Sequence, residues 1–584
     1  MLQFFKYVLA TIAGIFIFCL LSLMILGMIG SALSSGSGVT EVKEHSVLKL
    51  DLNKQIVENA PKEDPFEQLM QSGISKVGLV EIKDALANAA LDPNIDGIYL
   101  KAEIPQAGIA TLAEIRGALE KFKESGKFIY VYSEMMTEGA VYLNSVADEI
   151  YMPEVGDLEL NGLNAKVTFM KGLFDKIGIE PEIFRVGEYK SAVEPYIRKD
   201  MSPENREQIS SYVNSIADQI YGQLAESRGM TRVELDAIIN ATVNSTQEAK
   251  DKNIITEVGY FDEFESALKE KLNLEDDDKI SFIELSNYSK AKKFVEKGDR
   301  SNRIAVIVGQ GTIYSGEGDN QSIGSDAWVK ELRKAVKDSK VKAIVLRINS
   351  GGGSALASDV MWREIELAKK EKPVYASMGD YAASGGYYMA MSCDTIVANP
   401  TTVTGSIGIF GMLFNAQELM NNKLGITFDG VETHEHSDFP SLVSEMPQSE
   451  KNLIQNMVNE GYERFTSKAA AGRKMELDKL KSLAGGRVWT GVQAKENGLV
   501  DVLGTLEDAV DLAAKRVGIE DDYQVKYYPT PKSDFELLVE RISEESKIDL
   551  KEKLGILAPL AEEVNELTRM EKLQARMPYE IAFE

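Results

Sequence analysis

The sequence predicts an α/β protein built from two tandem copies of one domain. Residues 92–152 align with residues 338–398 at a constant offset of 246, so that Asp148 and Ile150 fall on Asp394 and Ile396. Residues 201–230 and 446–475 match in the same way at an offset of 245. Each copy alternates apolar strands with helices, an order that favours parallel strands joined by right-handed crossovers. A chain of 584 residues is too long for one core.

Apolar runs and helical spacing define the elements of each copy. Residues 47–52 open the first copy as a strand, and residues 304–308 open the second. In the second copy residues 343–346 are expected to form a buried strand, and residues 374–376 another. The helix between them shows one apolar face: Ala357, Val360, Met361, Ile365 and Ala368.

The expected domains follow from these matches. They are residues 46–299 and residues 300–530, joined by the polar stretch 290–302. Residues 531–584 form a C-terminal tail that has no counterpart in the first copy. We assign the tail no function from its sequence.

An uncharged run of 24 residues, residues 7–30, precedes the repeats. It is long enough to cross a hydrocarbon core of about 30 Å, and longer than the apolar region of a signal peptide, about 7–15 residues. We therefore expect residues 1–30 to be an uncleaved transmembrane anchor and residues 31–45 a linker, although the small residues 31–35 leave cleavage open. Lys6 precedes the run, which places the N-terminus in the cytoplasm and the rest outside.

Composition excludes several classes of function. A net charge of −26 argues against nucleic acid or anionic lipid as a partner of the bulk of the chain. Cys19 and Cys393 lie in different surroundings and predict no disulfide. His45, His434 and His436 show no spacing typical of zinc ligands, so no metal or other cofactor is expected.

A glycine run follows the buried strand of the second copy. Gly351, Gly352 and Gly353 allow backbone N–H groups to approach a bound group closely, because no Cβ intervenes. Such a loop before a helix suits a phosphate or an oxyanion. The patterns of a Walker loop and of a dinucleotide fingerprint are both absent, and a tight structural turn is the alternative.

Ser384 lies among small residues after a strand of the same copy, where open α/β folds place their sites. It is a candidate nucleophile, or else it caps the following helix. The first copy has Glu138 at this position but contains Lys190, which the second copy lacks. A buried, neutral Lys190 is one candidate base and His436 the other; a solvated surface lysine is the alternative role for Lys190. These complementary losses suggest one site assembled from both copies.

Four motifs resemble the signal peptide peptidase A (protease IV) family in its long, duplicated form. They are Gly187-Glu188-Tyr189-Lys190-Ser191-Ala192-Val193-Glu194-Pro195, Ala382-Ala383-Ser384-Gly385-Gly386-Tyr387, Thr404-Gly405-Ser406-Ile407-Gly408-Ile409-Phe410-Gly411 and Gly486-Arg487-Val488-Trp489-Thr490-Gly491. The resemblance covers the anchor and both repeats. One position departs from it, because Gly351 stands where the family usually has a proline.

The resemblance implies a Clp-protease/crotonase-like fold in each half and a Ser-Lys dyad. Ser384 would be the nucleophile and Lys190 the general base, with the N–H groups of Gly352 and Gly385 as the oxyanion hole and Gly405 and Ser406 in the substrate groove. It also implies a ring-like homotetramer that degrades cleaved signal peptides and similar apolar peptides. The enzyme would be a single-pass protein of a bacterial inner membrane, with its catalytic part on the periplasmic side.

Two other functions remain open at this point. A crotonase-type acyl-thioester enzyme would use the same glycines without a role for Ser384 and Lys190 together. A non-catalytic membrane scaffold would need neither residue.

Overall fold

The computed structural model describes residues 14–18, 39–60, 75–295, 298–319, 321–520, 522–530 and 574–577. The predicted anchor, residues 7–30, lies outside the described residues except for 14–18. Within the described ranges, no helix combines the length and the apolar character that a membrane crossing requires.

The first half is built on a parallel sheet of six strands in the order β10-β7-β5-β4-β1-β11. Its strands are β1 (Ser46–Asp51), β4 (Ile95–Lys101), β5 (Phe128–Tyr132), β7 (Glu149–Met152), β10 (Glu257–Val258) and β11 (Ser281–Glu284). Short strand pairs flank this sheet: β2 (Gln55–Val57) with β3 (Lys76–Gly78), and β6 (Met135–Met136) with β8 (Asp157–Leu158).

The helices of the first half include α3 (Leu79–Leu91), α4 (Ile109–Lys123), α5 (Glu138–Asn144), α6 (Lys171–Ile177), α7 (Glu194–Ile197), α8 (Pro203–Ser227), α9 (Arg232–Ala241), α10 (Thr246–Asp251), α11 (Phe261–Lys271) and α12 (Leu285–Tyr288).

The second half repeats this plan in an eight-stranded sheet with the order β22-β20-β18-β16-β12-β24, in which β19 also pairs with β18, and β23 pairs with β19. The strands are β12 (Arg303–Gln310), β16 (Val341–Ser350), β18 (Val374–Ala383), β19 (Thr395–Ala398), β20 (Val403–Gly405), β22 (Val488–Thr490), β23 (Val502–Leu503) and β24 (Gln524–Tyr528). The helices are α13 (Ser325–Lys337), α14 (Ala355–Ala368), α15 (Gly385–Ala390), α16 (Gln448–Arg473), α17 (Leu477–Leu483), α18 (Gly491–Asn497) and α19 (Leu506–Val517).

The duplication seen in the sequence is present in the elements. Helix α3 begins at residue 79 and α13 at residue 325, and α4 and α14 begin at residues 109 and 355, both at an offset of 246. The long helices α8 and α16 begin at residues 203 and 448, an offset of 245. One detail of the predicted helix face is wrong: Val360 is 42% exposed, because it lies at the edge of the face that α14 turns to the core.

A third sheet joins the halves. Its order is β14-β15-β13-β17-β25-β21-β9. From the second half it takes β13 (Thr312–Tyr314), β14 (Gly318–Asp319), β15 (Ser322–Gly324), β17 (Gly352–Ser354) and β21 (Phe410–Asn415), and it adds β9 (Glu180–Arg185) and β25 (Gln574–Arg576). Strand β9 belongs to the range expected for the first domain, yet it pairs with β21 over its whole length.

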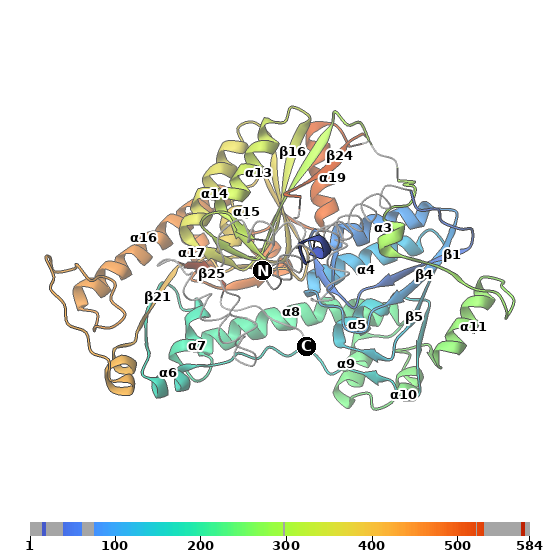
Figure 1. The fold of residues 1–584 in the computed structure, drawn as a ribbon, viewed down its shortest axis with the longest axis horizontal. Coiled ribbons are helices and arrows are strands. Elements are labelled where there is room, and N and C mark those ends of the chain that lie inside the picture. Colours follow the sequence, from blue (N-terminus) through green and yellow to red (C-terminus); the bar gives the residue numbers. More distant parts are fainter. Residues whose placement is uncertain are drawn as a thin grey trace, which may run out of the picture.

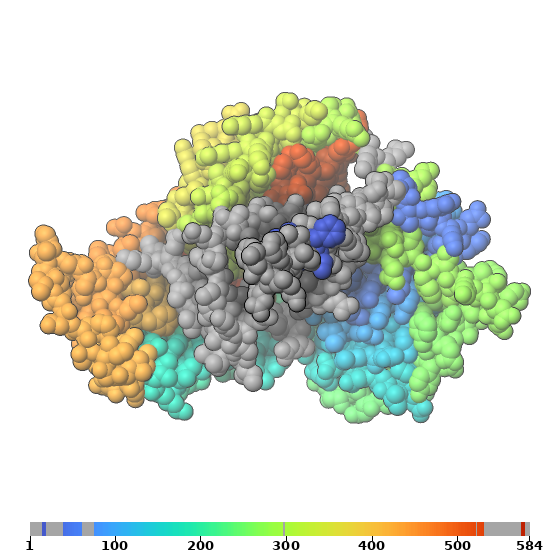
Figure 2. Space-filling model, in the orientation of Figure 1, coloured from blue at the N-terminus to red at the C-terminus, as the bar shows by residue number. Residues whose placement is uncertain are grey.

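Consequently the two halves are interleaved along their boundary. Figure 1 shows α6 and α7 lying below β21 and α16, and in Figure 2 the same segments, teal and orange, are in contact on the surface. This interleaving brings the turn after β9 to the end of β18.

Candidate active site

Ser384 lies at a sharp turn between strand β18 and helix α15. Its backbone N–H donates to the Gly405 carbonyl of β20 at 2.8 Å, and its φ is 53°. A positive φ is unfavourable for a residue with a side chain and costs about 1–3 kcal/mol. The hydroxyl makes no capping bond to α15, so a helix cap does not account for this serine. The turn holds Ser384 Oγ at the boundary of the two halves.

Lys190 reaches this point from the first half. It follows β9 and directly precedes a short 3-10 helix, η1 (Ser191–Val193). Its Nζ lies 2.8 Å from Ser384 Oγ. Both side chains are wholly buried, at 0% exposure. The structure therefore brings together the serine of one copy and the lysine of the other.

Burial lowers the pKa of Lys190 well below its ordinary value. Nζ donates to the carbonyl oxygen of Ser406 and to Ser406 Oγ, each at 3.1 Å. A neutral amine has two N–H groups and one lone pair. When Ser406 accepts both N–H groups, the lone pair is left to face the Ser384 hydroxyl.

Glycines surround the lysine and explain two of the motifs. A Cβ on Gly486 would lie 2.5 Å from Lys190 Cα, and Gly486 has a φ of +87°. A Cβ on Gly408 would lie 3.2 Å from Lys190 Cδ. The turn before the lysine is tied to the same loop, because Tyr189 N–H donates to the Gly485 carbonyl at 3.1 Å. Backbone segments of the second half thus form a close-fitting channel around the side chain of Lys190, which comes from the first half.

The glycine loop lies beside Ser384. Gly352 has a φ of +100°, and its N–H donates to Ser350 Oγ at 3.1 Å. Ser350 Oγ in turn donates to the Gly311 carbonyl at 2.6 Å. Gly385 is the first residue of α15, a position where backbone N–H groups have no partner within the helix. A Cβ on Gly352 would lie 2.6 Å from the backbone nitrogen of Gly385, so the two glycines face each other.

A buried charge network supports this loop from behind. Arg347, on β16 just before the loop, pairs with Glu58 at 2.8 Å and with Glu114 at 2.7 Å. Asn349 donates to Glu58 Oε1 at 3.0 Å. Both glutamates come from the first half, so the two halves hold the loop jointly. This network could not be predicted from the sequence, because an arginine on a strand and two distant glutamates share no motif.

The other sequence candidates lie apart from Ser384 or are bound elsewhere. His436 contacts Glu450 at 3.1 Å, with its side chain 46% exposed. His45 contacts Asp96 at 2.7 Å. Glu138, at the position equivalent to Ser384, accepts hydrogen bonds from the Tyr221 hydroxyl at 2.5 Å and from the Asn161 N–H at 2.9 Å. The first half therefore uses this position to hold its own loop.

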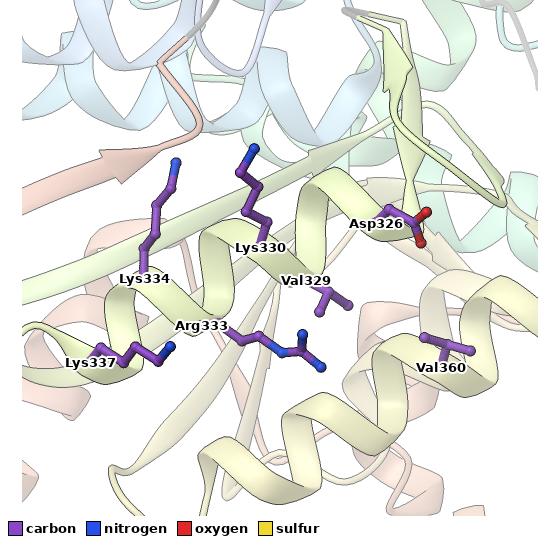
Figure 3. A pocket seen from close by; sticks show the side chains of 7 residues that line it. All are labelled: Asp326, Val329, Lys330, Arg333, Lys334, Lys337 and Val360. Carbon is purple, nitrogen blue, oxygen red and sulfur yellow. The ribbon is translucent and has the colours of Figure 1, made fainter.

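A hollow elsewhere on the surface lies between α13 and α14. Figure 3 shows the residues that line it: Asp326, Val329, Lys330, Arg333, Lys334, Lys337 and Val360. Arg333 is paired with Glu364 at 2.6 Å. None of the lining residues is among those described above around Ser384 and Lys190, and we assign the hollow no role.

Comparison with known proteins gives matches in both halves. The model of peptidase family S49 matches residues 121–275 and 366–520. The chloroplastic serine protease SPPA of Arabidopsis thaliana is 35% identical over 485 residues, which are 82% of this chain and 70% of that protein. Protease 4 of Haemophilus influenzae is 33% identical over 564 residues, which are 92% of this chain and 91% of that protein. Among solved structures, a mutant of ClpP1 from Listeria monocytogenes covers 36% of this chain and 95% of its own, at a TM-score of 0.24 and 13% identity.

Proposed function

The chain belongs to peptidase family S49 and is a serine protease, and from this premise we propose that Ser384 is its nucleophile and Lys190 its general base. The observation that supports this assignment is the 2.8 Å between Lys190 Nζ and Ser384 Oγ in a site closed to solvent. A nucleophilic serine needs a base within about 2.6–3.2 Å. Because the chain is a serine protease of this family, the two alternatives, a crotonase-type acyl-thioester enzyme and a non-catalytic membrane scaffold, are excluded.

The reaction needs only these two side chains and water. Ser384 Oγ attacks the carbonyl carbon of the scissile bond while Lys190 Nζ takes the hydroxyl proton. When the tetrahedral intermediate collapses, the C–N bond breaks and Lys190 gives its proton to the leaving amine. Water then attacks the acyl ester, with Lys190 again accepting a proton, and Ser384 is restored.

Backbone N–H groups are proposed to stabilise the oxyanion, each contributing about 2.7–4 kcal/mol. We keep Gly385 in this role. From the glycine loop we propose Gly353 in place of Gly352, because the Gly352 N–H is already donated to Ser350 Oγ. Gly353 lies opposite Ala575 of β25 in an antiparallel ladder, so its backbone groups face an extended strand that runs along the loop.

Ser406 and Gly405 receive more specific roles than a general place in the substrate groove. We propose that Ser406 orients the lysine, since its carbonyl and hydroxyl both accept from Nζ. Gly405 is proposed to fix the nucleophile, since its carbonyl accepts the Ser384 N–H. Both are positioning residues that act through Lys190 and Ser384.

The proposed substrates are cleaved signal peptides and similar apolar peptides, hydrolysed on the periplasmic side of a bacterial inner membrane. The uncharged run of residues 7–30 supports an anchor that would hold the enzyme near such peptides. A homotetramer of Clp-protease/crotonase-like halves is the proposed assembly, and it rests on the family resemblance of the motifs. Sedimentation of the detergent-solubilised chain tests the tetramer.

A fluorophosphonate probe, which reacts with activated serines, tests the dyad. We expect labelling of the wild type and none of Ser384→Ala. Lys190→Ala should abolish both labelling and hydrolysis of an apolar peptide, whereas His436→Ala should leave both unchanged. A silent Lys190→Ala together with an inactive His436→Ala would overturn the assignment of the base.

A further inference from the structure

Lys190 lies at the centre of a tight backbone turn. Its φ is −76° and its ψ is 70°, close to the values of an inverse γ-turn, about −75° and +65°. The Ser191 N–H closes the turn by donating to the Tyr189 carbonyl at 2.8 Å. A turn of three residues contains one such backbone bond, so the direction of the Lys190 side chain depends on the contacts that hold Tyr189 and Ser191 in place.

Gln208 binds both ends of this turn. It lies on α8, the long helix along the lower side of the molecule in Figure 1, and it is 1% exposed. Its Nε2 donates to Ser191 Oγ at 2.7 Å and to the Tyr189 carbonyl at 3.1 Å. An amide nitrogen carries two N–H groups, one for each of these acceptors. One side chain therefore holds the residue before Lys190 and the residue after it.

The other end of the same amide reaches the second half of the chain. Gln208 Oε1 accepts the Val488 N–H of β22 at 3.3 Å. The Tyr189 carbonyl can only accept and the Val488 N–H can only donate, so the two contacts together define which end of the amide is the nitrogen. The Tyr189 N–H donates to the Gly485 carbonyl of the same segment at 3.1 Å. Gln208 thus ties the turn to the part of the second half that encloses Lys190.

A buried polar cluster keeps Gln208 itself in place. Ser191 Oγ donates to Asn205 Oδ1 at 2.9 Å, and Asn205 Nδ2 donates to Glu194 at 2.9 Å. Asn205 Oδ1 also lies 3.1 Å from Gln208 Nε2. Ser191, Glu194 and Asn205 are each 0% exposed. Buried polar groups that satisfy one another in this way make a site rigid.

The copy without the lysine lacks this arrangement. At the offset of 245, Gln208 corresponds to Leu453, which is 47% exposed on α16. Asn205 corresponds to Glu450, which contacts His436 instead. A residue needed only for the fold that the copies share would be expected in both. The occurrence of Gln208 in the copy that has the lysine favours a role at Lys190.

We propose that Gln208 is a positioning residue for the general base: its amide clamps the γ-turn at Lys190 and so directs Nζ to Ser384 Oγ. This inference rests on the proposed function, because it takes Lys190 as the base. It goes beyond that function by naming a residue outside the four sequence motifs that controls how well the base works. Gln208 acts through Lys190 and is not itself a catalytic residue.

Replacing Gln208 by methionine tests the clamp, because methionine keeps the length of the side chain but has no amide. Since a displacement of about 1 Å can cost about 10²-fold in rate, kcat for a fluorogenic apolar peptide should fall by about ten- to 100-fold. KM should stay within about twofold of the wild type, because a buried amide is not available to a substrate. A kcat equal to that of the wild type would overturn the inference.

Gln223→Met is the matched control. It makes the same replacement on the same helix and removes the hydrogen bond that Gln223 Oε1 accepts from the Tyr142 hydroxyl at 2.5 Å. Both of these residues belong to the first half, so this variant should keep the kcat of the wild type. An equal fall of kcat in Gln223→Met and Gln208→Met would show a general effect on α8 and overturn the clamp.

The pH dependence of kcat/KM shows whether the effect passes through Lys190. Burial lowers the pKa of Lys190, and an amine that is no longer held in place regains water, so its pKa moves back towards the ordinary value. In Gln208→Met the rise of kcat/KM should therefore occur at higher pH than in the wild type. A lower kcat with an unmoved profile would indicate a purely structural role and overturn the inference.

Ser191→Ala removes one end of the clamp with a smaller change, and it carries the test if Gln208→Met does not fold. Loss of one hydrogen bond should lower kcat by about two- to tenfold. The double variant should be no slower than Gln208→Met alone, because the Ser191 hydroxyl acts through Gln208. An unchanged kcat in Ser191→Ala, or falls that add in the double variant, would contradict the clamp.

Lys190→Ala separates this inference from the proposed function. If Lys190→Ala is inactive and Gln208→Met has the kcat of the wild type, the clamp is wrong and Lys190 remains the base. If Lys190→Ala retains hydrolysis and fluorophosphonate labelling, the base is wrong and the clamp falls with it.

Discussion

Replacing Lys190 by methionine removes the amine but keeps a long, apolar side chain in the channel. We expect peptide hydrolysis to be lost without loss of the fold. General base catalysis contributes about 10²–10⁴-fold, which at 1.36 kcal/mol per factor of ten corresponds to about 2.7–5.4 kcal/mol of transition-state stabilisation. Lys190 Nζ lies 2.8 Å from Ser384 Oγ, so the base is lost directly. The fall in kcat should therefore reach at least the upper part of this range.

The same variant tests whether the amine is buried in its neutral form. Burial lowers the pKa of Lys190 well below its ordinary value, so between the two values the unfolded chain binds a proton that the folded chain lacks. The stability of the wild type then rises with pH across this window, by about 1.36 kcal/mol for each unit of the lowering. Methionine does not titrate. Lys190→Met should therefore be at least as stable as the wild type at pH 7, and should lose that advantage towards pH 10.

Urea unfolding followed by circular dichroism at pH 7 and pH 9.5 measures the stability, and a fluorogenic apolar peptide measures kcat. Lys166→Met is the matched control, because Lys166 is exposed and its replacement should change neither quantity. Activity within tenfold of the wild type would refute the role of Lys190 as base. If the difference in stability between Lys190→Met and the wild type had the same size and sign at both pH values, the burial of Lys190 as a neutral amine would be refuted.

Four further predictions follow from the contacts of the site. Gly486→Ala places a Cβ 2.5 Å from Lys190 Cα at a φ of +87°, so kcat should fall more than tenfold while the circular dichroism spectrum is unchanged; near-normal kcat would show that the channel adjusts. Ser406→Ala removes one of two acceptors of the Lys190 amine, worth about 0.5–1.5 kcal/mol, and should lower kcat by up to about tenfold without changing KM. In a pH–rate profile, kcat/KM should rise with pH through the lowered pKa of Lys190, because only the neutral amine acts as base; a rate that falls over that range contradicts the mechanism. Arg347→Met leaves the buried carboxylate of Glu58 without its cation, while Glu114 keeps Lys83, and should reduce the free energy of unfolding in urea by about 3–5 kcal/mol; a change below 1 kcal/mol would contradict the network.

The repeated elements could be predicted from the sequence because they depend on local spacing. Helix α14 was expected from residues that recur every three or four positions, and the structure differs only at the exposed Val360. The α/β class with two family S49 domains is confirmed by the family match in both halves. The boundaries of the two domains stay a prediction, and β9 shows that elements from the first range complete a sheet of the second.

The candidate site was predictable only in part. The pairing of Ser384 with Lys190 could be expected because each copy lacks what the other contains. The sequence could not show whether the Gly352 N–H is available to an oxyanion. Its hydrogen bond to Ser350 Oγ depends on the conformation of the loop. The tail gave no signal at all, because a strand of three residues such as β25 has no periodicity to detect.

By itself the sequence determined that the chain is duplicated, that its elements alternate between strand and helix, and that a serine and a lysine survive in different copies. Local patterns carry such information, because strand and helix periods are read over a few residues. Only the tertiary structure decided that β9 pairs with β21 of the other half, that Lys190 is buried against glycines of the second half, and that β25 pairs with β17 of the glycine loop. These features depend on contacts between residues hundreds of positions apart, which packing and burial select and which no local pattern records.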